Sequence, residues 1–210
     1  MARKPNQKKA PRPNLKKKKT PDLLVQRCYQ LRIELIDVRP TVWRRFVVPD
    51  WVKLSDLHRI LQAVMGWDDC HLHSFNIGAD EYGPPDPEGN DPATKNEGLV
   101  RLHEVAPDKG TVFFYGYDPG DGWSHRVCVE EIRSQGLGPE MLACLEGARA
   151  CPLEDCGGPP GHMALVTALV KGPSDVQGKE LLKWAGAYDP DKFDIASVNG
   201  RLKMLRWESR

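Results

Sequence analysis

Histidine and aspartate residues in the middle of the chain offer the side chains that bind divalent metals. His71 and His73 are two positions apart, so in a strand both imidazoles would point to one face. Asp118, Asp121 and His125 lie further along, around a turn and the start of another strand. Imidazole and carboxylate ligands suit zinc, manganese or iron, and such an ion lowers the pKa of a bound water for hydrolysis. His71, His73, Asp121 and His125 are therefore the candidate metal ligands.

Two adjacent acids, Glu154 and Asp155, lie in a segment that ends at Gly157 and Gly158. Neighbouring carboxylates on a loop can act as an acid/base pair, and they are also common as solubilising residues. Together with the histidines they define an enzymatic hypothesis, a metal-dependent hydrolase or nuclease. In this hypothesis Glu154 or Asp155 is the catalytic general base.

The same polar residues also suit a binding cleft without catalysis, which is our leading hypothesis. Their side chains would recognise a ligand or brace the loops, because no nucleophile motif accompanies them. A purely structural role in capping the turn and packing the core is the simplest alternative. The sequence requires no cofactor and allows a divalent metal. The candidate binding residues are His73, Asp118, Asp121, Trp123, His125 and Arg45.

Arg44 and Arg45 occupy neighbouring positions of a predicted strand, so their side chains point to opposite faces. One of them must face the core, where a guanidinium needs an anionic partner. An Asp or Glu of the acidic body is the simpler partner, and a phosphate is the alternative.

Hydrophobic periodicity predicts the strands that must position these residues. Apolar and polar residues alternate from Tyr29 to Leu35, which is typical of a half-buried strand. A turn rich in Asp and Gly separates two later strands and favours a hairpin there. The predicted strands cover 29–35, 42–48, 71–77, 111–117 and 123–132.

One helix is predicted between the second and third of these strands, and further helices are predicted after the last strand. The first is expected to begin at Ser55 as N-cap and to end at Gly66, with His58 at the edge of its apolar stripe. Others are predicted over 163–170 and 178–184 and after Phe193, whereas 144–158 shows no clear period. This content predicts an α+β domain, with an antiparallel or mixed sheet and helices packed against it.

The charges are distributed unevenly along the chain. Thirty basic and 29 acidic residues give a net charge of +1, but nine basic residues and no acid lie in 1–21. We therefore expect a disordered basic arm over 1–22 and a single acidic domain over 23–210, with a long acidic loop rich in Pro and Gly over 79–98. The basic residues of the arm are Arg3, Lys4, Lys8, Lys9, Arg12, Lys16, Lys17, Lys18 and Lys19.

The basic arm supports a third hypothesis, a nucleic-acid accessory protein. Its positive charges can contact phosphates and release counterions, which gives sequence-independent binding that weakens with salt. A solubilising tail and a sorting signal fit the same charges.

Absent motifs exclude several common classes of protein. The chain has no P-loop, G-x-S-x-G or dinucleotide-binding motif, and no motif requires it to be an enzyme. No C-x-x-C pair occurs among its six cysteines, which argues against a zinc ribbon and thioredoxin-like chemistry. No apolar run approaches the ~18 residues of a membrane span, and no signal-type segment follows the basic start. We expect a cytoplasmic protein with free thiols and no membrane partner.

Three longer stretches occur together in a characteristic order. They are LSDLHRILQAVMGWDDCHLHSFNIGADEYGPP at 54–85, YGYDPGDGWSHRVCV at 115–129 and CLEGARACPLEDCGGPPG at 144–161. With WRR at 43–45 and AYDPDKFD at 187–194, they make the chain resemble the plasmid ORF-three-like family, named after the third open reading frame of a root-inducing plasmid.

The resemblance extends over about 29–202 and implies a compact α+β domain with an antiparallel sheet. Members of this family are often found on plasmids and mobile elements. Some are labelled as transposon resolvases, but the label carries no mechanism, and the chain has no resolvase serine motif. Pro119 and Leu153 depart from the family pattern, in which an aromatic residue and a second proline are usual.

Overall fold

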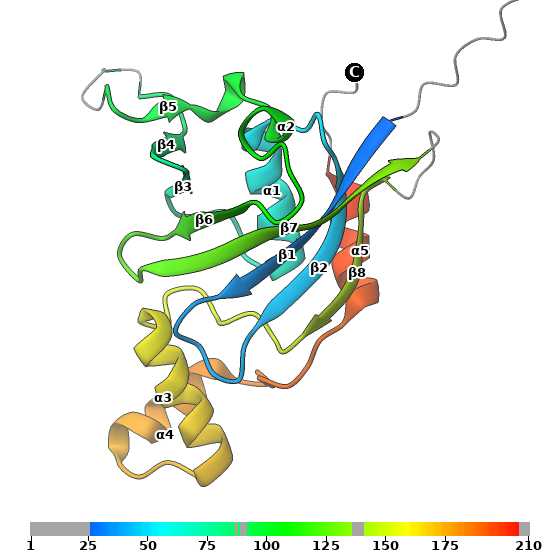
Figure 1. The fold of residues 1–210 in the computed structure, drawn as a ribbon. Coiled ribbons are helices and arrows are strands. Elements are labelled where there is room, and N and C mark those ends of the chain that lie inside the picture. Colours follow the sequence, from blue (N-terminus) through cyan, green and yellow to red (C-terminus); the bar gives the residue numbers. More distant parts are fainter. Residues whose placement is uncertain (1–25, 87, 89–91, 136–140, 206–210) are drawn as a thin grey trace, which may run out of the picture.

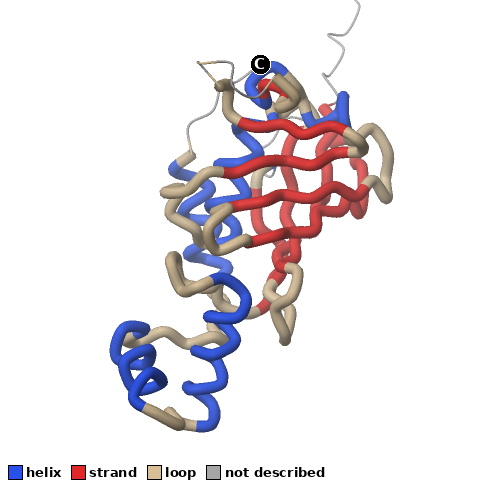
Figure 2. Tube along the Cα trace, turned by 90° about the vertical axis from the view of Figure 1, so that its left-hand side faces the viewer, coloured by secondary structure: helices blue, strands red, loops and turns tan. Residues whose placement is uncertain are grey.

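The computed structural model describes residues 26–86, 88, 92–135 and 141–205 (Figure 1). The predicted basic arm over 1–22 lies outside these residues. Within them the chain forms an eight-stranded sheet, and Figure 2 shows the helices on one side of it. The α+β class predicted from the sequence is confirmed.

The sheet is mixed but almost entirely antiparallel. Its strands are β1 (Gln26–Leu35), β2 (Trp43–Pro49), β3 (His73–Ile77), β4 (Asp80–Gly83), β5 (Lys95–Asn96), β6 (Val112–Tyr117), β7 (Trp123–Gln135) and β8 (Ala143–Ala148). Their order is β5-β4-β3-β6-β7-β1-β2-β8, and only β4 and β5 pair in parallel. Because β3 pairs with β6, the turn after β6 lies beside the residues that precede β3.

Two groups of helices differ in their relation to the sheet. The helical elements are α1 (Leu54–Met65), the 3₁₀ turn η1 (Glu97–Leu99), α2 (Leu102–Val105), α3 (Gly158–Lys171), α4 (Val176–Ala185) and α5 (Ile195–Met204). Helices α1 and α5 pack against the sheet, whereas α3 and α4 form a pair that projects from one end of the body (Figures 1 and 2). None of the helices in the described ranges is both long and apolar enough to cross a membrane.

The core lies between α1 and the sheet. It is formed by the apolar faces that the alternating pattern of β1 and the helical pattern of α1 predict. Leu31 and Ile33 of β1 are fully buried, as are Leu57 and Leu61 of α1. Full burial of such a side chain contributes roughly 1.5–3 kcal/mol to stability. The helix ends at Gly66 as predicted, with a left-handed φ of 115°, but it begins earlier than expected, with Lys53 rather than Ser55 at its N-cap.

Two segments contain more regular structure than their sequences indicate. The aperiodic segment 144–158 contributes most of β8, which pairs with β2. The side chain of Asn199 accepts from the N–H of Cys144 at 2.8 Å and donates to its carbonyl at 3.1 Å, so α5 occupies hydrogen-bonding groups at this edge of the sheet. The predicted loop 79–98 holds the short strands β4 and β5 and the start of η1.

Arg44 is the arginine that faces inward, and its partners are not the expected anions. Its guanidinium is 2% exposed and donates to the carbonyls of Val64 at 3.0 Å and of Trp43 and Ala148 at 2.8 Å each. It also lies 4.4 Å from the centre of the Phe193 ring. Since Val64 belongs to the last turn of α1, a buried cation caps the negative end of this helix.

Candidate metal centre

Three loops meet at one end of the sheet and bring four ligand-type side chains together. The loop before β3 carries His71, the β6–β7 turn carries Asp118, and the segment between β8 and α3 carries Glu154 and Asp155. The backbone N–H of Asp118 donates to the carbonyl of Leu72 at 2.9 Å, which extends the pairing of β3 with β6 to this cluster.

The spacing within the cluster fits a metal ion better than hydrogen bonds. His71 Nε2 lies 3.6 Å from Asp118 Oδ2, 3.8 Å from Glu154 Oε2 and 3.2 Å from Asp155 Oδ1. A tetrahedral zinc ion with bonds of about 2.1 Å holds its ligand atoms about 3.4 Å apart. N–H···O hydrogen bonds span about 2.7–3.2 Å, so the separations from Asp118 and Glu154 exceed hydrogen-bond length, whereas that from Asp155 is at its upper end. The separations from His71 bracket the tetrahedral value, and the ligand atoms fall into two groups that share His71: those of His71, Asp118 and Asp155 lie within 4.8 Å of one another, as do those of Cys70, His71 and Glu154.

Glu154 is oriented by donors that engage only one of its oxygens. Its Oε1 accepts from the N–H of Asp68 at 2.8 Å and from the hydroxyl of Tyr117 at 3.0 Å. Burial and the hydrogen bond to the Glu154 carboxylate raise the pKa of Tyr117, although the N–H of Cys70 acts in the opposite direction. The hydroxyl therefore keeps its proton for Glu154, whose Oε2 faces His71.

Asp118 is held in the same way. Its Oδ1 accepts from the N–H groups of Gly120 at 3.0 Å and Asp121 at 3.2 Å, and Oδ2 faces His71. Its backbone is left-handed, with a φ of 51°, a conformation that Asp tolerates because its side chain bonds the local backbone. The side chain of Asp118 is 8% exposed, whereas that of Asp155 is 74% exposed. The centre is thus closed on the Asp118 side and open on the Asp155 side.

Two buried polar atoms at this centre make no hydrogen bond of good geometry within the described ranges, although one of them lies 3.2 Å from Asp155 Oδ1. They are His71 Nε2 and Glu154 Oε2, which face each other across 3.8 Å. Leaving a buried polar group unsatisfied costs roughly 1–3 kcal/mol, so such atoms are uncommon and call for an explanation. A cation between them would satisfy both.

The other two histidines predicted as ligands lie elsewhere. His73 Nε2 is 2.9 Å from Glu97 Oε2. His125 is fully buried, where its Nδ1 donates to the carbonyl of Tyr115 at 3.1 Å and its Nε2 accepts from the indole of Trp67 at 3.4 Å. Burial lowers the pKa of His125 to about 4, so the ring is neutral at physiological pH. Neither residue belongs to a ligand-type cluster with His71 in the described part of the chain.

The remaining predicted residues have contacts of other kinds. Asp121 accepts from the N–H of Gly157 at 3.1 Å and so joins two of the loops. Trp123 is 1% exposed and packs in the core, as the structural alternative predicts. Arg45 lies on the face of the sheet away from α1, where its Nε is 2.6 Å from Glu130 Oε2. None of these three residues belongs to a group of ligand-type side chains with His71 in the described ranges.

A closed ring of hydrogen bonds beside the centre was not predicted from the sequence. The N–H of Asp69 donates to Gln62 Oε1 at 3.0 Å, and Gln62 Nε2 donates to the Tyr115 hydroxyl at 2.8 Å. That hydroxyl lies 2.8 Å from His58 Nδ1, and His58 Nε2 lies 2.7 Å from Asp69 Oδ1. Burial and the neighbouring His73 lower the pKa of His58. Its neutral imidazole therefore accepts from the Tyr115 hydroxyl at Nδ1 and donates to Asp69 from Nε2.

The position of His58 within this ring agrees with the sequence, but its partners come from other elements. His58 is buried at the edge of the core, on the apolar side of α1. Its ring stacks on that of His73, with centroids 3.4 Å apart and planes 5° from parallel. Gln62 is four residues after His58, which places both on one helical face. This i, i+4 spacing is the one feature of the local sequence that indicates the cycle of hydrogen bonds.

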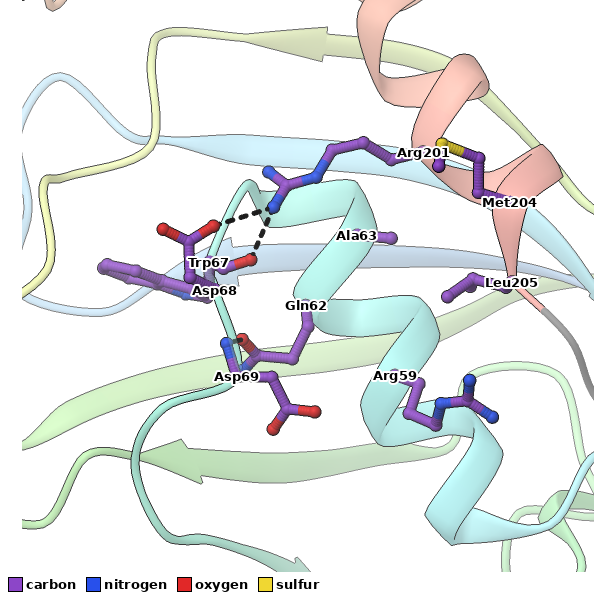
Figure 3. A pocket seen from close by; sticks show the side chains of 9 residues that line it. All are labelled: Arg59, Gln62, Ala63, Trp67, Asp68, Asp69, Arg201, Met204 and Leu205. Atoms are coloured by element: carbon purple, nitrogen blue, oxygen red, sulfur yellow. Dashed lines mark hydrogen bonds and ion pairs between the residues drawn. The ribbon is translucent and has the colours of Figure 1, made fainter.

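The loop that carries His71 is anchored on both sides. A cavity of about 360 Å³ lies behind it, and Figure 3 shows Arg201 of α5 bonded there to the carbonyl of Trp67 at 2.8 Å and to Asp68 Oδ1 at 3.1 Å. The N–H of Asp68 binds Glu154 on the other side. The loop therefore holds its shape through contacts with two separate segments.

Comparisons with known proteins agree on a family and a fold. The family described as "Plasmid pRiA4b ORF-3-like protein" matches residues 27–197. An uncharacterised protein of Sinorhizobium fredii is 36% identical over 176 residues, which cover 84% of this chain and 88% of that protein. A crystal structure of a protein of unknown function from Methanosarcina mazei superposes with a TM-score of 0.73 at 30% identity, covering 82% of this chain and 97% of that one.

Proposed function

The chain belongs to the plasmid pRiA4b ORF-3-like family, and from the geometry of its three loops we propose that this domain binds one divalent transition-metal ion. The observation that carries the proposal is the set of distances from His71 Nε2 to three carboxylates, 3.2–3.8 Å. Asp118 and Glu154 supply oxygens that no other protein group engages closely, and Asp155 supplies one from the exposed side. We therefore propose a binding cleft around His71, where the sequence predicted one around His73.

The ligand set favours zinc, manganese or iron over magnesium or calcium. Magnesium requires octahedral oxygen ligands and retains several waters, and calcium takes six or more oxygens. One imidazole with carboxylates is a mixed nitrogen and oxygen set, which suits the borderline transition metals. Zinc is the first ion to test, because it accepts few ligands and binds both imidazole and carboxylate groups.

A protonated His71 paired with the same carboxylates is the alternative explanation of this cluster. It would compensate part of the negative charge but would leave Nε2–O distances beyond those of good hydrogen bonds. The two interpretations differ in metal content, which can be measured directly.

The test is elemental analysis of purified full-length protein after dialysis against each metal. Wild type is expected to retain about one ion per chain, as is His103→Gln, a control histidine that lies 3.1 Å from the carbonyl of Asp50 away from the cluster. His71→Gln and Asp118→Asn are expected to lose the ion while unfolding at temperatures close to that of wild type. A folded wild-type protein without metal after loading would reject the proposal.

Metal-dependent hydrolysis is a second candidate, supported by the open side of the centre. In this variant of the proposal Asp155 does not bind the ion: its exposed carboxylate, 3.2 Å from His71 Nε2, lies within reach of a metal-bound water and is the better general base of the two predicted acids. Zinc-loaded protein should then cleave chromogenic esters or phosphodiesters, and Asp155→Asn should lose this activity but keep the metal. Equal cleavage by both proteins would reject this role of Asp155.

Nucleic-acid contact by the basic arm is a third candidate, and only the nine charges of residues 1–21 support it. Full-length protein should bind duplex DNA with a plot of log K against log salt as steep as about −8 if every charge contacts a phosphate. A protein starting at Asp22 should lose this binding. Equal binding by the two proteins would show that the arm is not responsible.

A further inference from the structure

We infer that Cys70 is a thiolate ligand of an ion held with His71 and Glu154 and that its oxidation by a peroxide releases the metal. This inference rests on the proposed function, because it concerns the ligand set and the regulation of the centre around His71. It adds a soft ligand to that set and makes the centre sensitive to redox conditions.

The first support is the position of the thiol. The sulfur of Cys70, a ring nitrogen of His71 and a carboxylate oxygen of Glu154 all lie within 4.8 Å of one another. Consecutive residues of an extended segment point to opposite sides, so this convergence needs a bend in the chain. The chain bends at Asp69, which has a left-handed φ of 56°, and bends again at His71 itself.

The second support is the way the neighbouring groups hold Cys70. Its N–H donates to the Tyr117 hydroxyl at 3.1 Å, and its Sγ lies 3.7 Å from the same oxygen. That hydroxyl in turn donates to Glu154. Tyr117 therefore fixes the backbone of Cys70 and the carboxylate of Glu154 together, as outer groups commonly do around metal ligands.

The third support is accessibility, which distinguishes Cys70 from most of the other thiols. Cys70 is exposed, whereas Cys28, Cys144 and Cys156 are buried. Burial raises the pKa of those three thiols, to about 12 for Cys156, and this keeps them protonated and unreactive. A soluble oxidant reaches Cys70 without opening the core.

The release reaction is a thiolate oxidation by hydrogen peroxide. The sulfur of Cys70 attacks one oxygen of the peroxide, an S–O bond forms and the O–O bond breaks. The sulfur is oxidised to a sulfenic acid, and the peroxide is reduced to hydroxide, which takes up a proton to become water. The neutral sulfenic acid is a poor ligand compared with the thiolate, so the ion is held only by its nitrogen and oxygen ligands and dissociates more readily.

Cobalt(II) substitution of the full-length protein tests whether the thiol binds the ion. Bound cobalt gives visible d–d absorption, and a thiolate ligand adds a charge-transfer band in the near ultraviolet. Wild type and the control Cys128→Ser, which changes a half-buried cysteine of β7, should show both. Cys70→Ser should keep the d–d bands, lose the charge-transfer band and bind cobalt at least about tenfold more weakly.

Each outcome has a distinct meaning. Visible bands without charge transfer in wild type, unchanged in Cys70→Ser, would reject Cys70 as a ligand and leave the metal centre intact. No visible bands in wild type would reject the proposed function itself. Peroxide treatment of the zinc form provides the second measurement: a chromogenic chelator should detect zinc release from wild type and Cys128→Ser several times faster than from Cys70→Ser, and equal rates would overturn the redox role.

Discussion

The carboxylate of Asp121 accepts a hydrogen bond from the backbone N–H of Gly157, with 3.1 Å between Oδ2 and N. This bond joins the turn that carries Asp118 to the segment that carries Asp155. The two backbones also approach closely at Gly158, where a Cβ atom would lie 2.1 Å from the carbonyl oxygen of Asp121. Asp121, expected from the sequence to be a ligand, instead holds together the loops that meet at His71.

Gly158→Ala is expected to separate these loops. The added Cβ would overlap the carbonyl of Asp121, and the residue has a left-handed φ of 67°, so both backbones must move. We expect a loss of about 3 kcal/mol or more in the free energy of unfolding, measured with urea. Gly172→Ala is the matched control, because Gly172 has a φ of 82° but no atom within 4 Å of the added carbon. It should cost about 1 kcal/mol, and equal losses would contradict the proposed contact.

Substitutions of Asp121 test its role as a positioning residue. Asp121→Ala removes the acceptor for the Gly157 N–H and should weaken zinc binding by about 10–100-fold without abolishing it. Asp121→Asn keeps a side-chain oxygen at the same place and should restore most of the affinity. Competition with a chromogenic chelator measures both values. An Asn variant as weak as the Ala variant would indicate that the negative charge itself is needed.

Features set by residues close together in the sequence could be predicted, whereas those set by contacts between distant segments could not. The strand with Leu31 and the helix with Leu57 were predictable because periodicity is a local property of the sequence. The choice between His71 and His73 was not, because it depends on where β3 begins, and the pairing with β6 sets that point at His73. His71 therefore stays in the preceding loop, beside Asp118, and the two histidines do not share a face.

The partners of these residues required tertiary structure. Glu154 and Asp155 were singled out by composition alone, and only the contacts of their loop with Asp68 and Asp121 bring them to His71. Strand β8 has no alternating pattern and forms because β2 offers it an edge. Such contacts link residues far apart in the chain, and a single sequence carries no signal of them.

Tyr115→Phe tests the ring of hydrogen bonds around His58. Removing the hydroxyl leaves His58 Nδ1 and Gln62 Nε2 without their partner in the core, and each unsatisfied group costs roughly 1–3 kcal/mol. We expect a loss of about 3 kcal/mol in the free energy of unfolding. Tyr188→Phe is the control, since the buried hydroxyl of Tyr188 has no hydrogen-bond partner in the described part of the chain. It should be neutral or stabilising, and a similar loss in both variants would argue against the ring.

His125 predicts how stability depends on pH. Burial lowers its pKa from 6.5 to about 4 in the folded protein. Between these values the unfolded chain binds a proton that the folded chain does not, so the free energy of unfolding should fall as the pH decreases from about 6.5 to 4. The full effect is about 3 kcal/mol. Unfolding curves of wild type and His125→Gln across this range should show a smaller slope for the variant, and parallel curves would exclude His125 as the titrating group.

Arg44 and Arg45 lie on opposite faces of β2, so lysine substitutions at the two positions compare a buried arginine with a partly exposed one. Arg44 binds four backbone carbonyls and, among the residues that the structure describes, no carboxylate, and burial lowers its pKa. A lysine at this position has a compact ammonium that cannot replace the planar fork, so Arg44→Lys should leave carbonyls of α1 unsatisfied and cost about 3 kcal/mol. Arg45→Lys changes a partly exposed ion pair with Glu130 and should cost less than about 1 kcal/mol.

Salt separates the two arginines further. Because Arg44 acts through neutral carbonyls inside the protein, the loss in Arg44→Lys should be nearly the same at low and high ionic strength. The smaller loss in Arg45→Lys should shrink as salt screens its pair with Glu130. Urea unfolding of both variants at two salt concentrations measures these differences. A salt-dependent loss at Arg44 would mean that an anion also contacts this guanidinium, which is the partner that the sequence first suggested.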